Sequence, residues 1–144
     1  MYYFDSDTSI EFLRGKLPQT YQIMQSSSPR LFGIPAIVEA ELRFGAANSN
    51  NPEENRLLVE RFLSAFTIIP FDSIAAKTYA EIRLDLQKHG NIIGPNDLLI
   101  AATAKANNAV LISNNVRVFS RVKGLALESW AEIDHSEAYP TDRN

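Results

Sequence analysis

Short apolar runs alternate with helical patterns along most of the chain, and this alternation constrains the fold more than any other feature. Between the apolar runs, hydrophobic residues recur every three or four positions, as they do over residues 75–86. Strands that are separated by helices form a parallel sheet covered on both faces. We therefore predict an α/β protein, a three-layer α/β/α sandwich with a central parallel sheet. The expected strands are 2–4, 31–34, 67–71, 109–112 and 125–130.

Local signals predict where the helices begin and end. Thr8-Ser9-Ile10-Glu11 fits a capping box, so a helix is expected to begin near Thr8. Pro35 suits the first turn of a second helix, which should end near Gly45. A third helix should end at His89-Gly90. The segment 97–106 is apolar nearly all round, which is typical of a buried helix.

Composition excludes several classes of chemistry. The chain has 144 residues, two histidines and no cysteine, which excludes disulfides and thiolate sites and corresponds to about one domain. It contains no phosphate-binding glycine loop and no Gly-x-Ser-x-Gly segment. No apolar run approaches the ~18 residues of a membrane span and no signal peptide is apparent, so we expect a cytoplasmic protein without a membrane partner. Any chemistry is expected to depend on carboxylates.

Glu41 lies at a position where a charged carboxylate is energetically costly. Its neighbours one helical turn away include Ile37, Val38 and Phe44, so its side chain should project from an apolar stripe. A buried carboxylate is costly unless a cation compensates it, and the alternative is a partly exposed residue at the edge of the helix. Glu39 differs, because Arg43 lies four residues on and the two should form a surface ion pair.

Asp5 and Asp97 lie at the starts of expected helices. Each could simply cap its helix, although Asn96 could serve as the cap in place of Asp97. Sites in parallel sheets form beyond the carboxyl ends of the strands, where Asp5 and Ser113 should lie. Asp5 and Asp97 would meet Glu41 there if their strands are neighbours. Three clustered carboxylates require a divalent cation such as Mg²⁺ or Mn²⁺, and the resulting chemistry is phosphodiester hydrolysis.

The formal net charge of −3 hides an uneven distribution. Residues 98–127 contain no acidic residue, whereas the terminal segment 128–144 is acidic. A basic patch could therefore exist on an acidic protein, and ordinary solvated helix charge is the alternative. The cations of the acid-free stretch are Lys105, Arg117, Arg121 and Lys123.

Four segments, taken in their order and spacing, resemble the motifs of the PIN-domain family. They cover about residues 1–132, which we take as one PIN domain, and leave 133–144 as a polar C-terminal tail. The segments are Phe4-Asp5-Ser6-Asp7-Thr8-Ser9-Ile10, Ile34-Pro35-Ala36 with Glu41-Leu42-Arg43-Phe44-Gly45, Asp97-Leu98-Leu99-Ile100-Ala101-Ala102, and Leu111-Ile112-Ser113-Asn114-Asn115 with Phe119.

The resemblance implies a set of functional residues. Asp5, Glu41 and Asp97 would be the metal ligands, and Ser113 and Asn115 would form hydrogen bonds beside the metal. Chains of this size and style are similar to VapC-type toxins of bacterial toxin–antitoxin pairs. That similarity implies Mg²⁺-dependent endoribonuclease activity, often on tRNA, inhibition by a VapB-like antitoxin whose tail enters the active site, and dimerisation of the toxin. The tentative RNA-binding residues are Arg117, Arg121 and Lys123.

Two departures from the family pattern affect the expected chemistry. Asp7 stands where the family has Asn, which adds a negative charge near the proposed ligands. Val118 stands where the family often has a fourth acid, and a valine cannot bind a second metal ion or orient its water. We therefore expect one tightly held Mg²⁺ and weakened activity.

Two alternatives remain open from the sequence. Asp5-Ser6-Asp7-Thr8-Ser9 after a strand also resembles the start of haloacid-dehalogenase-type phosphatases, in which Asp5 would be the nucleophile, Asp7 the general acid and Ser113 a phosphate ligand. That alternative leaves Glu41 and Asp97 without a role. The other alternative is a PIN-like module that Val118 has disabled and that only binds a partner or RNA.

Overall fold

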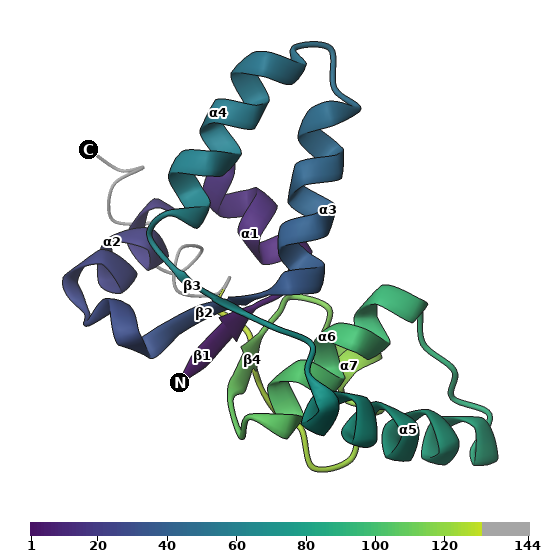
Figure 1. Cartoon of the computed structure of the whole chain (residues 1–144). Coiled ribbons are helices and arrows are strands. Elements are labelled where there is room, and N and C mark those ends of the chain that lie inside the picture. Colours follow the sequence, from purple (N-terminus) through teal and green to yellow (C-terminus); the bar gives the residue numbers. More distant parts are fainter. Residues whose placement is uncertain (131–144) are drawn as a thin grey trace.

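Five parallel strands form the centre of the molecule in the computed structural model, which describes residues 1–130 (Figure 1). Their order across the sheet is β3-β2-β1-β4-β5, and every neighbouring pair is parallel. The predicted central parallel sheet is therefore confirmed. The strands are β1 (Tyr2–Phe4), β2 (Phe32–Pro35), β3 (Thr67–Ile69), β4 (Val110–Ile112) and β5 (Ala126–Glu128).

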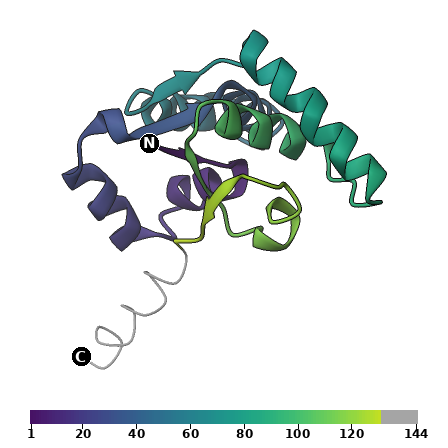
Figure 2. The same cartoon turned by 90° about the horizontal axis from the view of Figure 1, so that it is seen from below.

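Helices cover both faces of the sheet, which confirms the three-layer prediction (Figures 1 and 2). α3 and α4 pack against each other as an antiparallel pair that projects beyond the sheet, and α5 packs along α6. The helices are α1 (Ser6–Leu13), α2 (Pro18–Ser26), α3 (Ala36–Ala47), α4 (Pro52–Leu63), α5 (Ser73–Lys88), α6 (Pro95–Ala106) and α7 (Val116–Phe119), with a 3-10 turn η1 (Pro29–Leu31) before β2.

One face of the sheet is packed with aromatic rings. Phe4 on β1 contacts Phe12 of α1 edge-to-face, with ring centroids 5.1 Å apart, and stacks on Phe32 of β2 at 5.8 Å. Trp130, just beyond β5, reaches the same cluster and contacts Tyr2 at 5.4 Å. Aromatic pairs of this kind contribute about 0.5–1.5 kcal/mol beyond their buried area. They fix α1 against the sheet and, with it, the position of its first turn.

The other face is packed more closely and by smaller residues. Ile100, Ala101 and Ala102 of α6 are fully buried, which confirms the prediction of a buried helix over 97–106. Gly33 of β2 lies between Tyr3 and Ile69, and a Cβ at this position would come within 3.0 Å of the Ile69 side chain. A larger residue at position 33 would therefore push the neighbouring strands' side chains apart.

The chain changes direction across the sheet between β1 and β4. β1, β2 and β3 are laid down in order toward one edge, after which the chain returns through α5 and α6 to form β4 on the other side of β1. In open parallel sheets, ligands bind beyond the carboxyl ends of the strands at such a switch point. Asp5 follows β1 and Ser113 follows β4, so both lie at this switch point.

Several predicted helix boundaries were wrong. α1 begins at Ser6 rather than near Thr8, because Asp5 is the N-cap and its carboxylate accepts the Thr8 N–H. The N-cap of α6 is Gly94 rather than Asn96, since Pro95 begins the helix. α3 continues two residues past Gly45. α2 and α7 were not predicted, and β3 ends at Ile69.

The described residues contain no helix that is long and apolar enough to cross a membrane. The predicted C-terminal tail, residues 133–144, lies outside the part of the chain that the structure describes.

Candidate active site

Asp5 is held rigidly at the carboxyl end of β1. Its backbone N–H donates to the carbonyl of Ile112 on β4 (3.2 Å), and the residue is 3% exposed. One carboxylate oxygen accepts the N–H of Thr8 at 2.9 Å, and the other accepts the hydroxyl of Ser113 at 2.5 Å. Both oxygens are therefore fixed by the fold, one by the cap of α1 and one by β4.

Ser113 connects Asp5 to the turn that leads into α7. The buried hydroxyl donates to Asp5 and accepts the backbone N–H of Asn115 at 2.9 Å. The Ser113 N–H in turn donates to the carbonyl of Glu128, which anchors this turn to β5. Asn115 is half-buried and is the N-cap of α7. Ser113 thus positions both Asp5 and the backbone at Asn115.

Glu41 lies in the second turn of α3 and is half-buried. The hydroxyl of Ser6, the first residue of α1, donates to its carboxylate. Ser6 was not predicted as a site residue, although its position next to Asp5 in the first motif was a usable signal. Glu39 forms the predicted ion pair with Arg43, with the Arg43 Nε 3.0 Å from the Glu39 carboxylate.

Asp97 lies in the first turn of α6 and is half-buried. Burial raises its pKa, and the negative charges of Asp5, Glu41 and Asp7 raise it further. Within residues 1–130 its carboxylate accepts no side-chain or capping hydrogen bond. Asp97 is therefore repelled by the other acids, and no hydrogen-bond donor in the described residues compensates this repulsion.

The pKa of Asp5 is also raised, and burial is again the main cause. The hydrogen bonds from Ser113 and Thr8 lower it in part, and the nearby charge of Asp7 raises it. Two of the three predicted ligands are thus more difficult to ionise than ordinary aspartates. This is the behaviour expected of carboxylates that share a partly desolvated site without a cation.

The donor set has the chemistry of a hard-cation site, although its side chains are not converged. As they stand, no three Asp, Glu or His side chains in residues 1–130 come close enough together to hold one metal ion. Glu41 is bonded to Ser6, and Asp5 to Ser113. Asp97 nevertheless lies within electrostatic range of both Asp5 and Glu41, and three carboxylates placed in this way suit an oxygen-coordinated divalent ion.

The two departures from the family pattern lie on opposite sides of the site. Asp7 is exposed in the first turn of α1, and its charge acts on both Asp5 and Asp97. Val118 is half-buried in α7 and packs against the hydrophobic core. The negative charge is therefore present on the α1 side of the site and missing on the α7 side.

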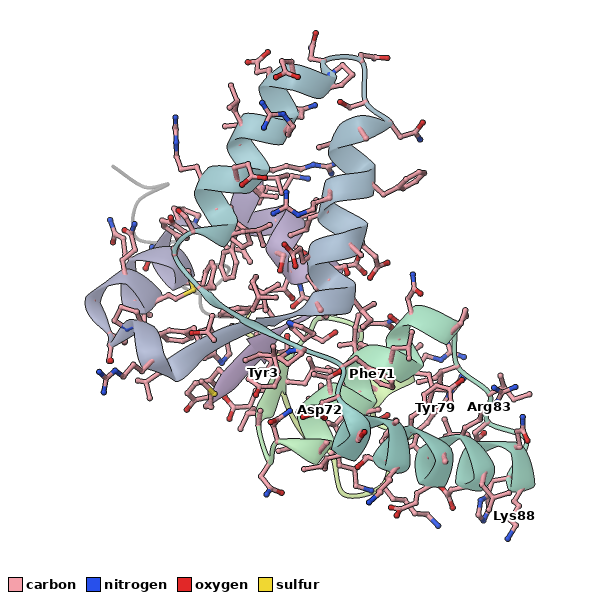
Figure 3. The ribbon with its side chains drawn as sticks, in the orientation of Figure 1. Tyr3, Phe71, Asp72, Tyr79, Arg83 and Lys88 are labelled. Carbon is pink, nitrogen blue, oxygen red and sulfur yellow. The ribbon has the colours of Figure 1, made fainter. Side chains whose placement is uncertain are left out.

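A further group of polar and aromatic residues surrounds α5 (Figure 3). Tyr79 accepts a hydrogen bond from Arg83 at 3.0 Å, and its ring lies edge-to-face with that of Phe71. Asp72 caps α5 through the N–H of Ala75 and, after burial, is the second cause of the raised pKa of Tyr3. These contacts stabilise α5 and its N-terminus. They do not involve Asp5, Glu41 or Asp97.

Comparison with known proteins agrees with the geometry. The PIN domain family matches residues 2–125. Ribonuclease VapC2 of Rickettsia felis is 44% identical over 97 residues, which make up 67% of this chain and 72% of that relative. The tRNA(fMet)-specific endonuclease VapC of Salmonella typhimurium is 32% identical over 126 residues, or 88% of this chain and 95% of that protein.

The chain belongs to the PIN-domain family and, within it, to the VapC ribonucleases. The crystal structure of VapBC2 from Rickettsia felis bound to a DNA fragment from their promoter superposes on it with a TM-score of 0.84 and 35% sequence identity. The match covers 90% of this chain and 98% of that one. The resemblance predicted from the four sequence segments is confirmed.

Membership of the VapC family removes the phosphatase alternative. That alternative also leaves Glu41 and Asp97 without a role, although Asp97 lies close enough to feel the charges of both other acids. Asp5 instead acts as the N-cap of α1 and lies beside Asp97 and Glu41 in the same electrostatic environment.

Two of the three tentative RNA-binding residues of this VapC chain have partners within the protein. Arg121 donates to the carbonyl of Ile92 at 3.1 Å, and Lys123 lies 3.6 Å from the carboxylate of Asp85 on α5. Arg117 is exposed in α7. The acid-free stretch of sequence therefore does not form a single patch of unengaged cations.

Proposed function

We propose that this VapC protein is a Mg²⁺- or Mn²⁺-dependent endoribonuclease whose metal ligands are Asp5, Glu41 and Asp97. The observation that carries the proposal is the placement of Asp5 at the carboxyl end of β1 and of Asp97 in the first turn of α6, where Asp97 feels the charges of both Asp5 and Glu41. Carboxylates that disfavour one another in this way are stabilised by a divalent ion. When bound, such an ion activates a water molecule and neutralises phosphate oxygens.

Hydrogen bonds from neighbouring residues hold two of the acids, Asp5 and Glu41, in position. Ser113 fixes one oxygen of Asp5, and the Thr8 N–H fixes the other, so Asp5 stays ionisable in a buried position. Ser6 holds the Glu41 carboxylate near α1. Asn115 lies half-buried at the start of α7, where its amide can contact a substrate oxygen. Second contacts of this kind orient ligands and tune their affinity for metal.

The proposed substrate is tRNA, with initiator tRNA as the first candidate. This rests on the relatives named tRNA(fMet)-specific endonuclease VapC, one of which is 32% identical over 126 residues. The proposed partner is a VapB-like antitoxin, since solved relatives are VapBC complexes. We also propose that the toxin forms a homodimer and that it acts in the cytoplasm, where its substrate is found.

Val118 leads us to propose one tightly held metal ion and reduced activity. The side chain packs on the core from α7 and offers no oxygen on that side of the site. The α7 side would therefore not hold a second ion, which would otherwise help to stabilise the charge of the leaving oxygen.

The direct test is cleavage of purified initiator tRNA by the purified protein with Mg²⁺ and with EDTA. Asp5→Asn is the decisive variant, because asparagine caps a helix about as well as aspartate does and the fold should be preserved. We expect Mg²⁺-dependent cleavage that falls by about 10²–10³-fold in the variant. Cleavage that persists in EDTA, or in folded Asp5→Asn, would refute the proposal, and a wild-type protein that binds RNA without cutting it would support the binding-only alternative.

A further inference from the structure

A polar groove lies along α1, and Asp7 and Asn115 line it, two residues after Asp5 and Ser113 respectively. One wall is α1 with its C-terminal turn, and the other is the turn between β4 and α7, which carries Asn114 and Asn115. The groove has a volume of about 800 Å³ and is open to solvent along its length. Asn114 of the second wall donates its side-chain amide to Glu11 of α1 at 2.8 Å, so the two walls are joined across the groove. The groove therefore lies close in sequence to the residues that follow β1 and β4.

The residues of α1 that line this groove form one stripe of the helix. Asp7, Ile10, Glu11 and Arg14 are spaced by three or four residues, so their side chains follow one another along the same face. At a rise of about 1.5 Å per residue, Arg14 lies roughly 10 Å along the helix from Asp7. The charge along the stripe changes from negative beside the acids to positive at its far end.

The turn after α1 places two cations at that far end. The Gly15 N–H donates to Phe12 and the Lys16 N–H donates to Glu11, which is the paired hydrogen-bond pattern of a Schellman motif. Gly15 has a φ of +69°, which glycine adopts without strain. Phe12 and Leu17 are buried on either side, so the backbone of the turn is fixed while Arg14 and Lys16 remain exposed.

Neither cation is used by the described part of the protein. Arg14 and Lys16 form no ion pair or side-chain hydrogen bond within residues 1–130. The nearest acid of the stripe, Glu11, already accepts the side-chain amide of Asn114 at 2.8 Å. Exposed Arg and Lys side chains beside a site for RNA hydrolysis are suited to phosphate oxygens. Arg14 also lines the neighbouring groove that contains Glu41, so it lies where the two grooves meet.

We propose that Arg14 and Lys16 bind backbone phosphates of the RNA substrate at the far end of the groove from the acids, and that the groove along α1 guides the strand to the acids. The proposal rests on the proposed ribonuclease function for the identity of the ligand. It adds α1 to the surface proposed to contact RNA, where Arg121 and Lys123 already have intramolecular partners. Arg14 and Lys16 would thus position the substrate and take no part in bond breaking.

The test measures binding of fluorescein-labelled initiator tRNA to the inactive Asp5→Asn protein by fluorescence polarisation over a range of salt concentrations. The test variant adds Arg14→Ala and Lys16→Ala. The control adds Arg30→Ala and Lys77→Ala, which removes the same charge from exposed sites elsewhere. Arg30 precedes β2 at the amino end of the sheet, and Lys77 lies on α5.

We expect the test variant to bind at least about 10-fold more weakly than the control, because two charged contacts to phosphate oxygens are lost. The slope of log affinity against log salt should fall in magnitude by about 2, or about 1 per lost phosphate contact. In an otherwise wild-type protein, the same pair of substitutions should raise KM with little change in kcat.

Equal affinity and equal salt slope in the test and control variants would overturn the inference. So would a loss of antitoxin binding in the test variant with RNA binding unchanged, which would assign the cations to a protein partner. The absence of RNA binding by the Asp5→Asn protein would overturn it as well. Failure of the ribonuclease proposal is seen separately, as a lack of Mg²⁺-dependent cleavage by the wild-type protein, since the binding measurement does not depend on cleavage.

Discussion

The two sides of the candidate site are built differently. On the side of β1 and β4, Asp5 is 3% exposed and both of its carboxylate oxygens accept hydrogen bonds from Thr8 and Ser113. On the side of α3 and α6, Glu41 and Asp97 are half-buried, and within residues 1–130 only Glu41 has a side-chain partner, Ser6. The sheet thus fixes one acid, while the helices leave two acids less constrained.

This difference separates what the fold determines from what a ligand must supply. Asp5 occupies the switch point of the sheet, so its place is set by strand order and by the cap of α1. Asp97 has a raised pKa because the other acids lie near it and nothing in the described chain compensates them. A site of this kind costs stability in the absence of a cation, as functional sites commonly do.

Removing the charge of Glu41 should give the largest change in RNA cleavage. This substitution tests whether the side of the site formed by α3 and α6 is needed for activity. We expect Glu41→Gln to reduce RNA cleavage by about 10²–10³-fold, because a proposed metal ligand is lost. Glu39→Gln is the matched control from the same helix, since it removes a surface ion pair with Arg43 worth only about 0.3–0.5 kcal/mol. Equal activity of the two variants would show that Glu41 is not a ligand.

Removing the hydroxyl of Ser113, which bonds to Asp5, tests the side of the site formed by β1 and β4. Ser113→Ala deletes the hydroxyl that bonds both Asp5 and the Asn115 N–H, and we expect activity or metal affinity to fall by about 10–100-fold. Ser113→Thr keeps the hydroxyl and should retain most of the activity. The measurement is initial cleavage rate at several Mg²⁺ concentrations, and a fully active Ser113→Ala protein would mean that Asp5 needs no such support.

Adding an acid at position 118 on α7 should increase the negative charge on that side of the site. We expect Val118→Asp to raise cleavage by a few-fold and to allow a second metal ion to bind, with some loss of stability because the valine packs on the core. Val118→Asn is a control of similar size without the charge. If the asparagine variant gains as much activity as the aspartate variant, the effect is due to altered packing.

The smallest expected effect is on the stability of the metal-free protein. The raised pKa of Asp97 means that the folded protein binds this proton more tightly than the unfolded chain does. The stability gained from that proton is present in acid and is lost as the pH rises through the raised pKa. Asp97→Asn should therefore increase the melting temperature at pH 7, and the gain should shrink as the pH is lowered toward the ordinary pKa of aspartate.

The increase should correspond to about 1 kcal/mol or less, because Asp97 is half exposed and solvent screens its charge. Asp85→Asn is a control of opposite sign, since it removes an acid that faces Lys123 at 3.6 Å. Thermal denaturation in EDTA at several pH values measures both variants. A lower melting temperature for Asp97→Asn at pH 7 would contradict the proposed repulsion among the acids.

Much of this architecture followed from the sequence because its signals are local. Alternating strand and helix patterns were sufficient for a parallel sheet, and position relative to a strand end was sufficient to single out Asp5 and Ser113. The cap of α1 was predicted at Thr8 and lies at Asp5, because an aspartate directly after a strand fits both a cap and a ligand and here serves as the cap. Local patterns could not distinguish these roles.

The contacts that depend on distant segments were not predictable in this way. Ser6 meets Glu41 across 35 positions of the chain, and Asn114 meets Glu11 across 103. Arg117, Arg121 and Lys123 stay a prediction as RNA contacts, and the fold adds that Arg121 bonds to Ile92 and that Lys123 lies near Asp85. A charge distribution along the sequence gives no direction for a side chain, so these two partners could not be predicted from it.

Calorimetric titration of the purified protein with Mg²⁺ tests the central claim most directly, because it reports on metal binding without requiring the right RNA. The expected result is one tight site in the wild-type protein that is lost in Asp97→Asn, while the folded state of the variant is preserved. Two sites of similar affinity in the wild type, or unchanged binding in Asp97→Asn, would contradict the account.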